Sequence, residues 1–486
     1  MHVTILNLTL YIVSHLCQVD RSFLRWYSKT MENNVKVSFS TALKDTNKYN
    51  KMLPKDRVQL RKKRLYDIVT YAKENSAFYK ELYKDIPEHF VLADIPTTSR
   101  AKLLEDYSAW TTDSGVSLDG IYAHMEAHPD SSVKYLDKYE IVSSSGIESD
   151  PLISLYDDNC SVYLSAEAAS RIFARKEHFW AFVTHGARVA YIYSTSGAFF
   201  PTVYARMIAQ NIPLQKRKSL LLQAQSPISQ LVSALNGFNP AILDGYPSAL
   251  LRLADEKKAG RLKISPRYIM ASGEELSEES RERLSTVFGC DVSTSYFTAE
   301  TGVIGFECRE HHLHINEDWC IVEPVDFDNN PVADGEPCDH ILVTNLMNFT
   351  QPVIRYALDD KVIVHTSECL CGNPSPYLEV VGKSLDQLVF NNGSSEILIP
   401  VDELDSLMNS IDGIKRYQLL IYPNNYVSLR LLAGKGYDKT SLYFKVEKVL
   451  RSFLNNLGVI TPAITLEKEE PQPDPLSGKY LTIITE

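Results

Sequence analysis

Between about residues 139 and 380, short apolar runs alternate with segments of helical pattern, and this alternation constrains the fold more than any other feature. Ser277 has the side chain of a helix N-cap, two glutamates follow it, and Gly289 can end the helix. Three apolar runs have the length and residue types of buried strands: 188–194, 241–244 and 341–346. The pattern predicts a large α/β domain with a mostly buried sheet.

The last hundred residues have a different pattern. A helical stripe of apolar residues ends at Gly458. Further elements are a short helix at 401–408, a hairpin of 417–422 with 426–432, and a strand at 463–467. They predict a small α+β unit of ferredoxin-like type.

A chain of 486 residues exceeds the usual size of one hydrophobic core, so we expect more than one domain. We predict an extension at 1–50 that is poorly ordered, an N-terminal domain at 51–382 and a mobile C-terminal domain at 383–486. Within the N-terminal domain, 55–84 has the pattern of one helix.

The N-terminal segment from Met1 to Cys17 is apolar, but it lacks a basic region before the apolar residues and is short for a membrane span. We interpret residues 1–30 as an extension or a start-site artefact, and we expect no membrane segment. A net charge of −11 argues against generic nucleic-acid binding. Eight cysteines scattered along a long chain favour a reduced, cytoplasmic setting.

Residues 351–360 form an apolar, strand-like run that contains Arg355 and closes with two acids. A buried arginine is unfavourable unless it is paired. Arginine and aspartate at a strand end are a common means of holding phosphates and ribose hydroxyls. This run predicts part of a nucleotide site.

Three other segments carry chemistry only in combination. The small hydroxyl residues of 143–151 offer groups for phosphate oxygens, although a solvated serine-rich turn is the better explanation of this loop taken alone. Within 296–302, an aromatic residue precedes a carboxylate that has the chemistry of a Mg²⁺ ligand; a buried tyrosine and a helix-start glutamate are the alternative. Lys479 lies near the C-terminus in a glycine-containing loop, where most lysines are simply solvated.

A set of three cysteines and one histidine has the composition of a structural zinc site. Its members are Cys308, His314, Cys369 and Cys371. His311 and His312 are rival ligands, and a buried free cysteine near surface histidines is the competing interpretation.

Taken in order, these segments resemble the adenylate-forming superfamily, and most closely its phenylacetate–CoA ligase-like and CapK-like branch. The resemblance runs from about residue 55 to the end. It includes 243–250, 271–276, the 351–360 run, which fits Pro-Leu-Ile-Arg-Tyr-x-x-x-Asp, and 382–386, which is similar to the family hinge. The Cys/His set resembles the zinc site of this branch.

The resemblance implies ATP or AMP as ligand, Mg²⁺, a structural Zn²⁺ and CoA as a possible further cofactor. As catalytic residues it implies Lys479, which would bridge the substrate carboxylate and the α-phosphate, Glu300, which would hold Mg²⁺, and Arg355, which would support the nucleotide pocket. Asp360 would bind the ribose hydroxyls, Lys383 would stand at the hinge, and Tyr246 would line the acyl pocket. The remaining nucleotide-binding residues would be Ser144, Ser145, Gly146, Ser272, Gly273, Glu274, Tyr296, Phe297 and Thr298.

The implied reaction is the activation of a small carboxylic acid with ATP, followed by acyl transfer to CoA, a carrier protein or an amine. The chain departs from the family pattern in the phosphate loop, at 147–149, and at Phe297, where the family has glycine. These departures keep an alternative open, in which the protein binds a nucleotide or an acid without efficient turnover.

Overall fold

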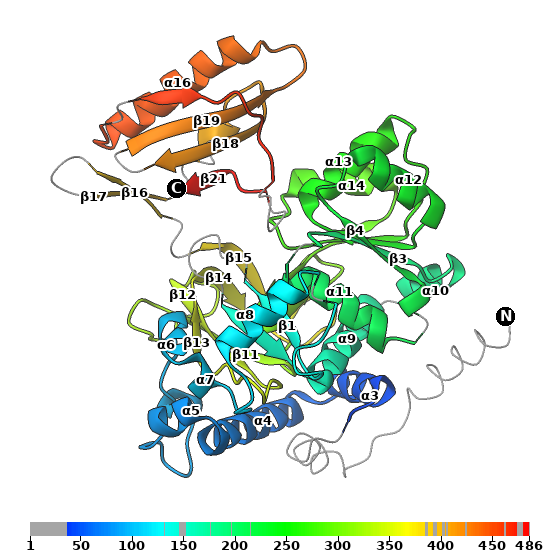
Figure 1. Ribbon diagram of the computed structural model, residues 1–486, viewed down its shortest axis with the longest axis vertical. Helices are drawn as coiled ribbons and strands as arrows, with labels where there is room; N and C mark the ends of the chain where they lie inside the picture. The colour runs from blue at the N-terminus through cyan, green and yellow to red at the C-terminus, as the bar shows by residue number, and fades with distance from the viewer. Residues whose placement is uncertain are drawn as a thin grey trace. The chain divides into compact units, whose positions relative to one another are not determined.

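A computed structural model describes residues 36–486 except 131, 145–151, 175, 196, 214, 384–386, 392–395, 401–403, 405–406, 423–424, 461–462, 474–479 and 486. The chain divides into two compact units (Figure 1). The first unit runs to Leu358 and includes Val362–Glu379. The second comprises Asp359–Lys361 and the chain from Val380 onward.

The centre of the first unit is a five-stranded sheet in which every pair of neighbours is parallel. Its strands are β3 (Val189–Tyr193), β4 (Ser219–Gln223), β5 (Ile242–Gly245), β6 (Tyr268–Ala271) and β7 (Asp291–Ser293). The helices between them are α11 (Phe200–Asn211), α12 (Ile228–Phe238), α13 (Pro247–Lys258) and α14 (Glu278–Phe288). The strands expected at 188–194 and 241–244 are confirmed, as is α14 with its Ser277 cap and its left-handed Gly289.

The strand order β4-β3-β5-β6-β7 places a reversal of chain direction between β3 and β5. From β3 the chain moves outward to β4, and it then returns past β3 to β5 and continues in the opposite direction. Right-handed crossovers therefore place α11 on one face and the later helices on the other, as Figure 1 shows. In open α/β sheets, ligands bind outside the carboxyl ends of the strands at such a reversal.

The other sheets of the first unit contain antiparallel strand pairs. The pair β1 (Glu140–Ser143) and β2 (Ile153–Tyr156) forms a hairpin. A five-stranded sheet has the order β14-β15-β10-β9-β8 and comprises β8 (Ser295–Thr298), β9 (Gly302–Glu307), β10 (Leu313–Ile315), β14 (Asp360–His365) and β15 (Tyr377–Lys383). A third sheet joins β11 (Cys320–Val325), β12 (His340–Asn345) and β13 (Tyr356–Leu358), and β12 confirms the strand expected at 341–346.

The N-terminal helices differ from expectation in two ways. The helix expected at 55–84 is two helices, α4 (Pro54–Asn75) and α5 (Ala77–Leu82), because Ser76 leaves the helical conformation and caps α5 at the amide of Tyr79. Helix α3 (Phe39–Asn50) lies within the expected extension and packs against α9. The remaining helical elements are α6 (Arg100–Glu105), α7 (Tyr107–Trp110), α8 (Leu118–Ala127), α9 (Asp158–Ile172), α10 (Lys176–Thr184), and the 3₁₀ turns η1 (Leu92–Asp94) and η2 (Gln215–Arg217).

The second unit is a four-stranded sheet with its own apolar core. Its order is β20-β19-β18-β21, where β18 (Ile414–Tyr422) and β19 (Tyr426–Ala433) form the expected hairpin. The other elements are β16 (Gln387–Asn391), β17 (Glu396–Pro400), α16 (Lys439–Asn456), β20 (Ile464–Leu466) and β21 (Ile483–Thr485). Most of the helix expected at 401–408 lies outside the described residues.

Among the residues that the structure describes, no helix combines the length and the apolar character required to cross a bilayer.

Candidate functional site

The carboxyl ends of the parallel strands carry several of the predicted site residues. Strand β6 leads directly into Ser272–Glu274, and β5 leads into Tyr246. Strand β7 is followed after one residue by β8, which contains Tyr296–Thr298. One edge of the sheet, at the reversal between β3 and β5, therefore gathers segments that are far apart in the sequence.

The Ser272–Glu274 turn is held by side chains on both sides. The Ser272 hydroxyl accepts a hydrogen bond from the Ser295 amide at 3.0 Å. The Glu274 carboxylate accepts bonds from the amide and hydroxyl of Ser248, both at 2.9 Å. Gly273 has φ +87°, and a Cβ atom there would lie 2.9 Å from the Tyr246 ring, so this turn requires glycine.

Aromatic rings surround this turn. Tyr246 is fully buried, and its ring centroid lies 4.9 Å from that of Tyr193, edge to face. The ring of Phe297 lies 5.1 Å from that of Phe200, at the start of α11. Its tip would be 3.5 Å from a Cβ on Gly273. Phe297 therefore fills space beside the turn with an apolar ring.

Glu300 lies in the turn between β8 and β9 and is buried. Thr298, just before it, lies 2.8 Å from Thr301, hydroxyl to hydroxyl. The Tyr156 hydroxyl donates to the Ala299 carbonyl at 2.9 Å. Burial, then the charges of Cys160 and Glu300, raise the pKa of Tyr156. This turn is fixed on both sides of Glu300.

Ser144 ends the described part of the hairpin between β1 and β2. Its hydroxyl accepts a bond from the Leu152 amide at 2.9 Å, and the Ser143 amide donates to the Ala198 carbonyl, near the start of α11. The predicted phosphate loop therefore begins beside the β3–α11 connection. Ser145 and Gly146 lie outside the described residues.

Arg355 is buried, with a left-handed backbone (φ +44°). Its guanidinium donates two hydrogen bonds to Glu323, at 3.0 and 3.1 Å, and one to the Ile95 carbonyl at 2.6 Å. The expected pairing of a buried arginine is therefore made by Glu323, which the sequence did not single out. Burial raises the pKa of Glu323, and Arg355 opposes this shift.

The other predicted residues belong to the second unit or lie outside the description. Asp360 is the first residue of β14, is partly exposed and groups with the second unit. Lys383 is the last residue of β15. Lys479 is not among the described residues.

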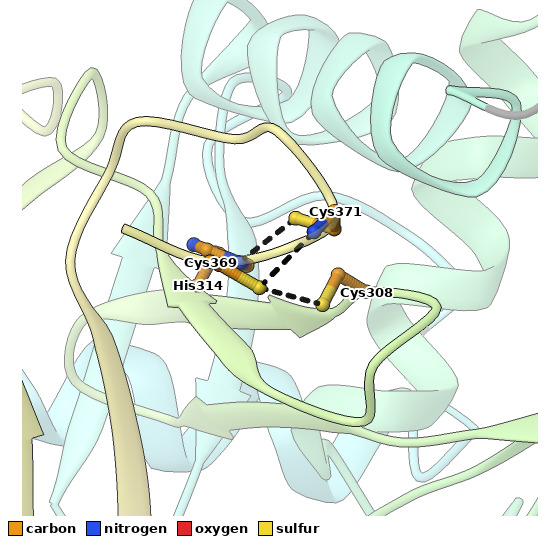
Figure 2. A group of neighbouring side chains, drawn as sticks. All are labelled: Cys308, His314, Cys369 and Cys371. Atoms are coloured by element: carbon orange, nitrogen blue, oxygen red, sulfur yellow. Dashed lines mark hydrogen bonds between the residues drawn. The ribbon is translucent and has the colours of Figure 1, made fainter. Parts of the chain in front are cut away.

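The predicted Cys/His set comes together. The ligand atoms of Cys308, His314, Cys369 and Cys371 all lie within 4.8 Å of one another, and Figure 2 shows the side chains converging. Cys308 and His314 come from either side of the β9–β10 turn, and the two other cysteines come from the loop before β15. The sulfurs of Cys308 and Cys369 are 3.8 Å apart, which is the ~3.8 Å edge that tetrahedral zinc–thiolate bonds of ~2.3 Å produce.

The surroundings of the cluster also fit a tetrahedral metal. The Nε2 atom of His314 lies 3.3 Å from the Cys371 sulfur, and its Nδ1 lies 2.8 Å from the Ser375 carbonyl. A carbonyl on the distant nitrogen is the usual means of orienting a histidine ligand. Burial raises the pKa of Cys371 to about 12 and lowers that of His314. A metal cation bound among the thiols would instead lower the pKa of Cys371.

His311 and His312, the alternative ligands for the Cys/His set, contact different groups. The Nδ1 atom of His311 lies 3.1 Å from Arg281 and 3.6 Å from Glu307. His312 stacks on Tyr377 with ring centroids 4.1 Å apart, and its Nδ1 lies 3.3 Å from the Cys369 sulfur. His312 is therefore a neighbour of the cluster.

Sequence reasoning missed one further polar pair at the sheet edge. Asp244, near the end of β5, accepts a hydrogen bond from the hydroxyl of Tyr193, the last residue of β3. Burial raises the pKa of Asp244 to about 7. The available signal was an aspartate in an otherwise apolar strand, Ala241-Ile-Leu-Asp.

Comparison with known proteins gives one weak sequence match and clear structural ones. No family model matches the chain. Protein CapK of Staphylococcus aureus is 24% identical over 168 residues, so the match spans 31% of this chain and only 36% of that protein.

Crystal structures of a 2-hydroxyisobutyryl-CoA ligase match nearly the whole chain. One, in the postadenylation state with R3-HIB-AMP, has a TM-score of 0.63 and 18% identity, over 90% of this chain and 91% of that one. An open conformation with 2-HIB-AMP and CoA has a TM-score of 0.55 and 17% identity, over 90% of this chain and 93% of that one. The chain has the fold of the adenylate-forming acyl-CoA ligases. This fold confirms the expected large α/β domain with a small α+β domain.

Proposed function

We propose that the protein is an ATP-dependent ligase that activates a small carboxylic acid as an acyl-adenylate. The observation that carries the proposal is the gathering of Ser272–Glu274, Tyr246 and Tyr296–Thr298 at the carboxyl edge of the sheet, beside its reversal, with Glu300 in the turn that follows β8. A ligase of the same fold has been crystallised with an acyl-adenylate.

In the proposed reaction, a carboxylate oxygen of the acid attacks the α-phosphorus of ATP. A new oxygen–phosphorus bond forms, and the bond to pyrophosphate breaks. Tyr296 and the Ser272–Gly273 turn flank the adenine, Asp360 holds the ribose hydroxyls, and Ser144 to Gly146 contact the phosphates. Lys479 stabilises the charge that develops between the carboxylate and the α-phosphate.

Glu300 is the residue that would hold Mg²⁺, which when bound would neutralise phosphate charge. Its burial in a turn fixed by Thr298 and Tyr156 supports this role, because a ligand on a rigid turn needs little reordering. Arg355 supports the pocket from behind, through its bonds to Glu323 and Ile95.

The second step transfers the acyl group from the adenylate to a thiol or amine, with release of AMP. CoA is the first acceptor to test, because the related ligase has been crystallised with it. A carrier protein and a free amine are the others. The Cys/His cluster would hold a structural Zn²⁺, because its four ligand atoms converge and the Nδ1 atom of His314 contacts the Ser375 carbonyl, as suits a closed tetrahedral site.

The test is ATP–pyrophosphate exchange over a panel of carboxylic acids. We expect exchange with at least one acid, and a loss of at least about a hundredfold in both Lys479→Ala and Glu300→Gln. The matched controls are Lys468→Ala and Glu279→Gln, which change exposed residues of the same types.

Calorimetry with ATP separates the proposal from its alternative. ATP binding without exchange for any acid would favour a binding protein of this fold. Such an outcome is physically reasonable, because Phe297 places a bulky ring beside Gly273. Absence of both exchange and ATP binding would exclude the ligase and a nucleotide-binding protein, and would leave only the binding of an acid.

A further inference from the structure

The Tyr193–Asp244 pair occupies the position in the sheet at which a ligand is most expected. Tyr193 ends β3 and Asp244 lies at the end of the adjacent strand β5, and the chain reverses direction between these two strands. The crevice outside the carboxyl ends of such strands is the usual ligand site in this sheet topology.

Among the described residues, phenols rather than cations interact with Asp244. The Tyr193 hydroxyl is its one hydrogen-bond donor among the described residues. Tyr191 is its register partner across β3, and its charge also acts on Tyr204 of α11. Burial raises the pKa of Asp244, and the bond from Tyr193 is what opposes the shift. A carboxylate in this setting lacks the counter-charge that buried acids ordinarily have.

Asp244 is nevertheless reachable. It keeps part of its surface accessible, whereas its neighbours Leu243 and Tyr246 are buried. The partial exposure of Asp244 supports access of a small ligand to this residue.

A second unsatisfied group lies at the same edge of the sheet. Gln225 follows β4 by two residues, and the amide of its neighbour Ala224 bonds to the Tyr193 carbonyl. Both polar atoms of the Gln225 side chain are buried and have no hydrogen-bond partner in the described part of the chain. Buried amides are nearly always bonded, so an unbonded one calls for a missing partner.

We infer that Asp244, positioned by Tyr193, binds the ammonium group of the acid that the enzyme activates, which makes the substrate an amino acid. This inference rests on the proposed function and names its substrate class. An ammonium beside Asp244 would supply the missing counter-charge and would favour the ionised carboxylate. Tyr246, two residues further on, would enclose the substrate's carbon atoms, and the amide of Gln225 would complete the polar set.

The experiment measures binding of amino acids and their deaminated analogues by calorimetry, with α,β-methylene-ATP present so that no turnover is needed. The panel contains the common amino acids, β-alanine and 4-aminobutyrate, each with its matched deaminated acid, and lactate beside alanine and propionate. We expect at least one amino acid to bind about tenfold or more tightly than its deaminated analogue. In Asp244→Asn this preference should fall below about threefold.

Two controls keep the result interpretable. Asp255→Asn removes an exposed carboxylate from α13 and should leave the preference unchanged. Tyr193→Phe removes the bond to Asp244 but leaves the charge, and should reduce the preference only in part. Thermal unfolding of each variant checks that it is folded.

The outcomes separate this inference from the proposed function. Ammonium-dependent binding that is lost in Asp244→Asn, without pyrophosphate exchange, would support the inference and reject the ligase. Exchange with apolar or hydroxy acids alone would support the ligase and overturn the inference. A preference that survives in Asp244→Asn, or no binding of any amino acid, would also overturn it.

Discussion

At the scale of single residues, the chain places charged side chains where their partners come from distant strands. Arg355 pairs with Glu323, which precedes it by more than thirty positions and lies across the sheet formed by β11, β12 and β13. The sequence predicted that a buried arginine needs a partner, but it did not single out Glu323. The pairing depends on strand register, which local patterns do not contain.

The titration of Asp244 should make the stability of the folded protein depend measurably on pH. Its pKa in the folded protein is about 7, above the ordinary 3.8, so folding favours the protonated form. The contribution of protonated Asp244 to the free energy of unfolding is therefore complete below about pH 4. This contribution is lost as the pH rises through 7. We expect the melting temperature of Asp244→Asn to rise relative to the natural chain between pH 4 and pH 8.

This prediction is checked by thermal unfolding at several pH values, always as a difference between variant and natural chain. Other titrating groups largely cancel in that difference. Tyr191, Tyr193 and Tyr204 surround Asp244 and remain in both proteins. A difference that stays flat from pH 4 to pH 8 would contradict a raised pKa.

At the scale of elements, local signals predicted several strands and the caps of α14, while tertiary packing decided the rest. The limits of α14 followed from Ser277 and Gly289, whose side chain and backbone freedom act within one turn. The break at Ser76 was missed because the apolar spacing continues across it. Helix α3 was missed because its burial depends on α9, and includes polar residues such as Asp45 and Thr46.

The Cys/His cluster joins the β9–β10 turn to the loop before β15, so it should hold metal and support both elements. We expect purified protein to contain one zinc per chain, and Cys371→Ser to lose it and to melt at a lower temperature. Cys290→Ser changes a cysteine outside the cluster and should retain the metal. Elemental analysis measures the content, and zinc retained in Cys371→Ser would exclude this ligand set.

At the scale of the whole molecule, the sequence predicted the architecture, but it did not predict which separate segments meet at the candidate site. The strand–helix alternation predicted the α/β unit, and the hairpin with its following helix predicted the small one. The candidate site could be predicted only as separate segments. Ser272, Tyr246 and Phe297 meet because the parallel strands end at one edge. The role inferred for Asp244 depends on its hydrogen bond with Tyr193.

The proposed ligase is built from two units, and its second step should need movement between them. Proline in place of Asp386, in the predicted hinge, fixes φ and restricts the preceding residue. We expect this variant to retain most of the pyrophosphate exchange but to lose at least about tenfold of the acyl transfer to CoA or another acceptor. Glu469→Pro, at an exposed position of the second unit, is the control. Equal losses in both reactions would argue against a hinge at this position.

The Cys/His cluster has a consequence for the unfolded chain as well. A metal bound by His314 and Cys369 would close a loop that contains β11 to β14, and with them Arg355 and Asp360. If the ion stayed bound during unfolding, closure of a loop of this length would lower the conformational entropy of the unfolded state by an amount worth about 4 kcal/mol, by analogy with a disulfide. The ion would then keep the segment with Asp360, the proposed ribose ligand, near its native neighbours during refolding.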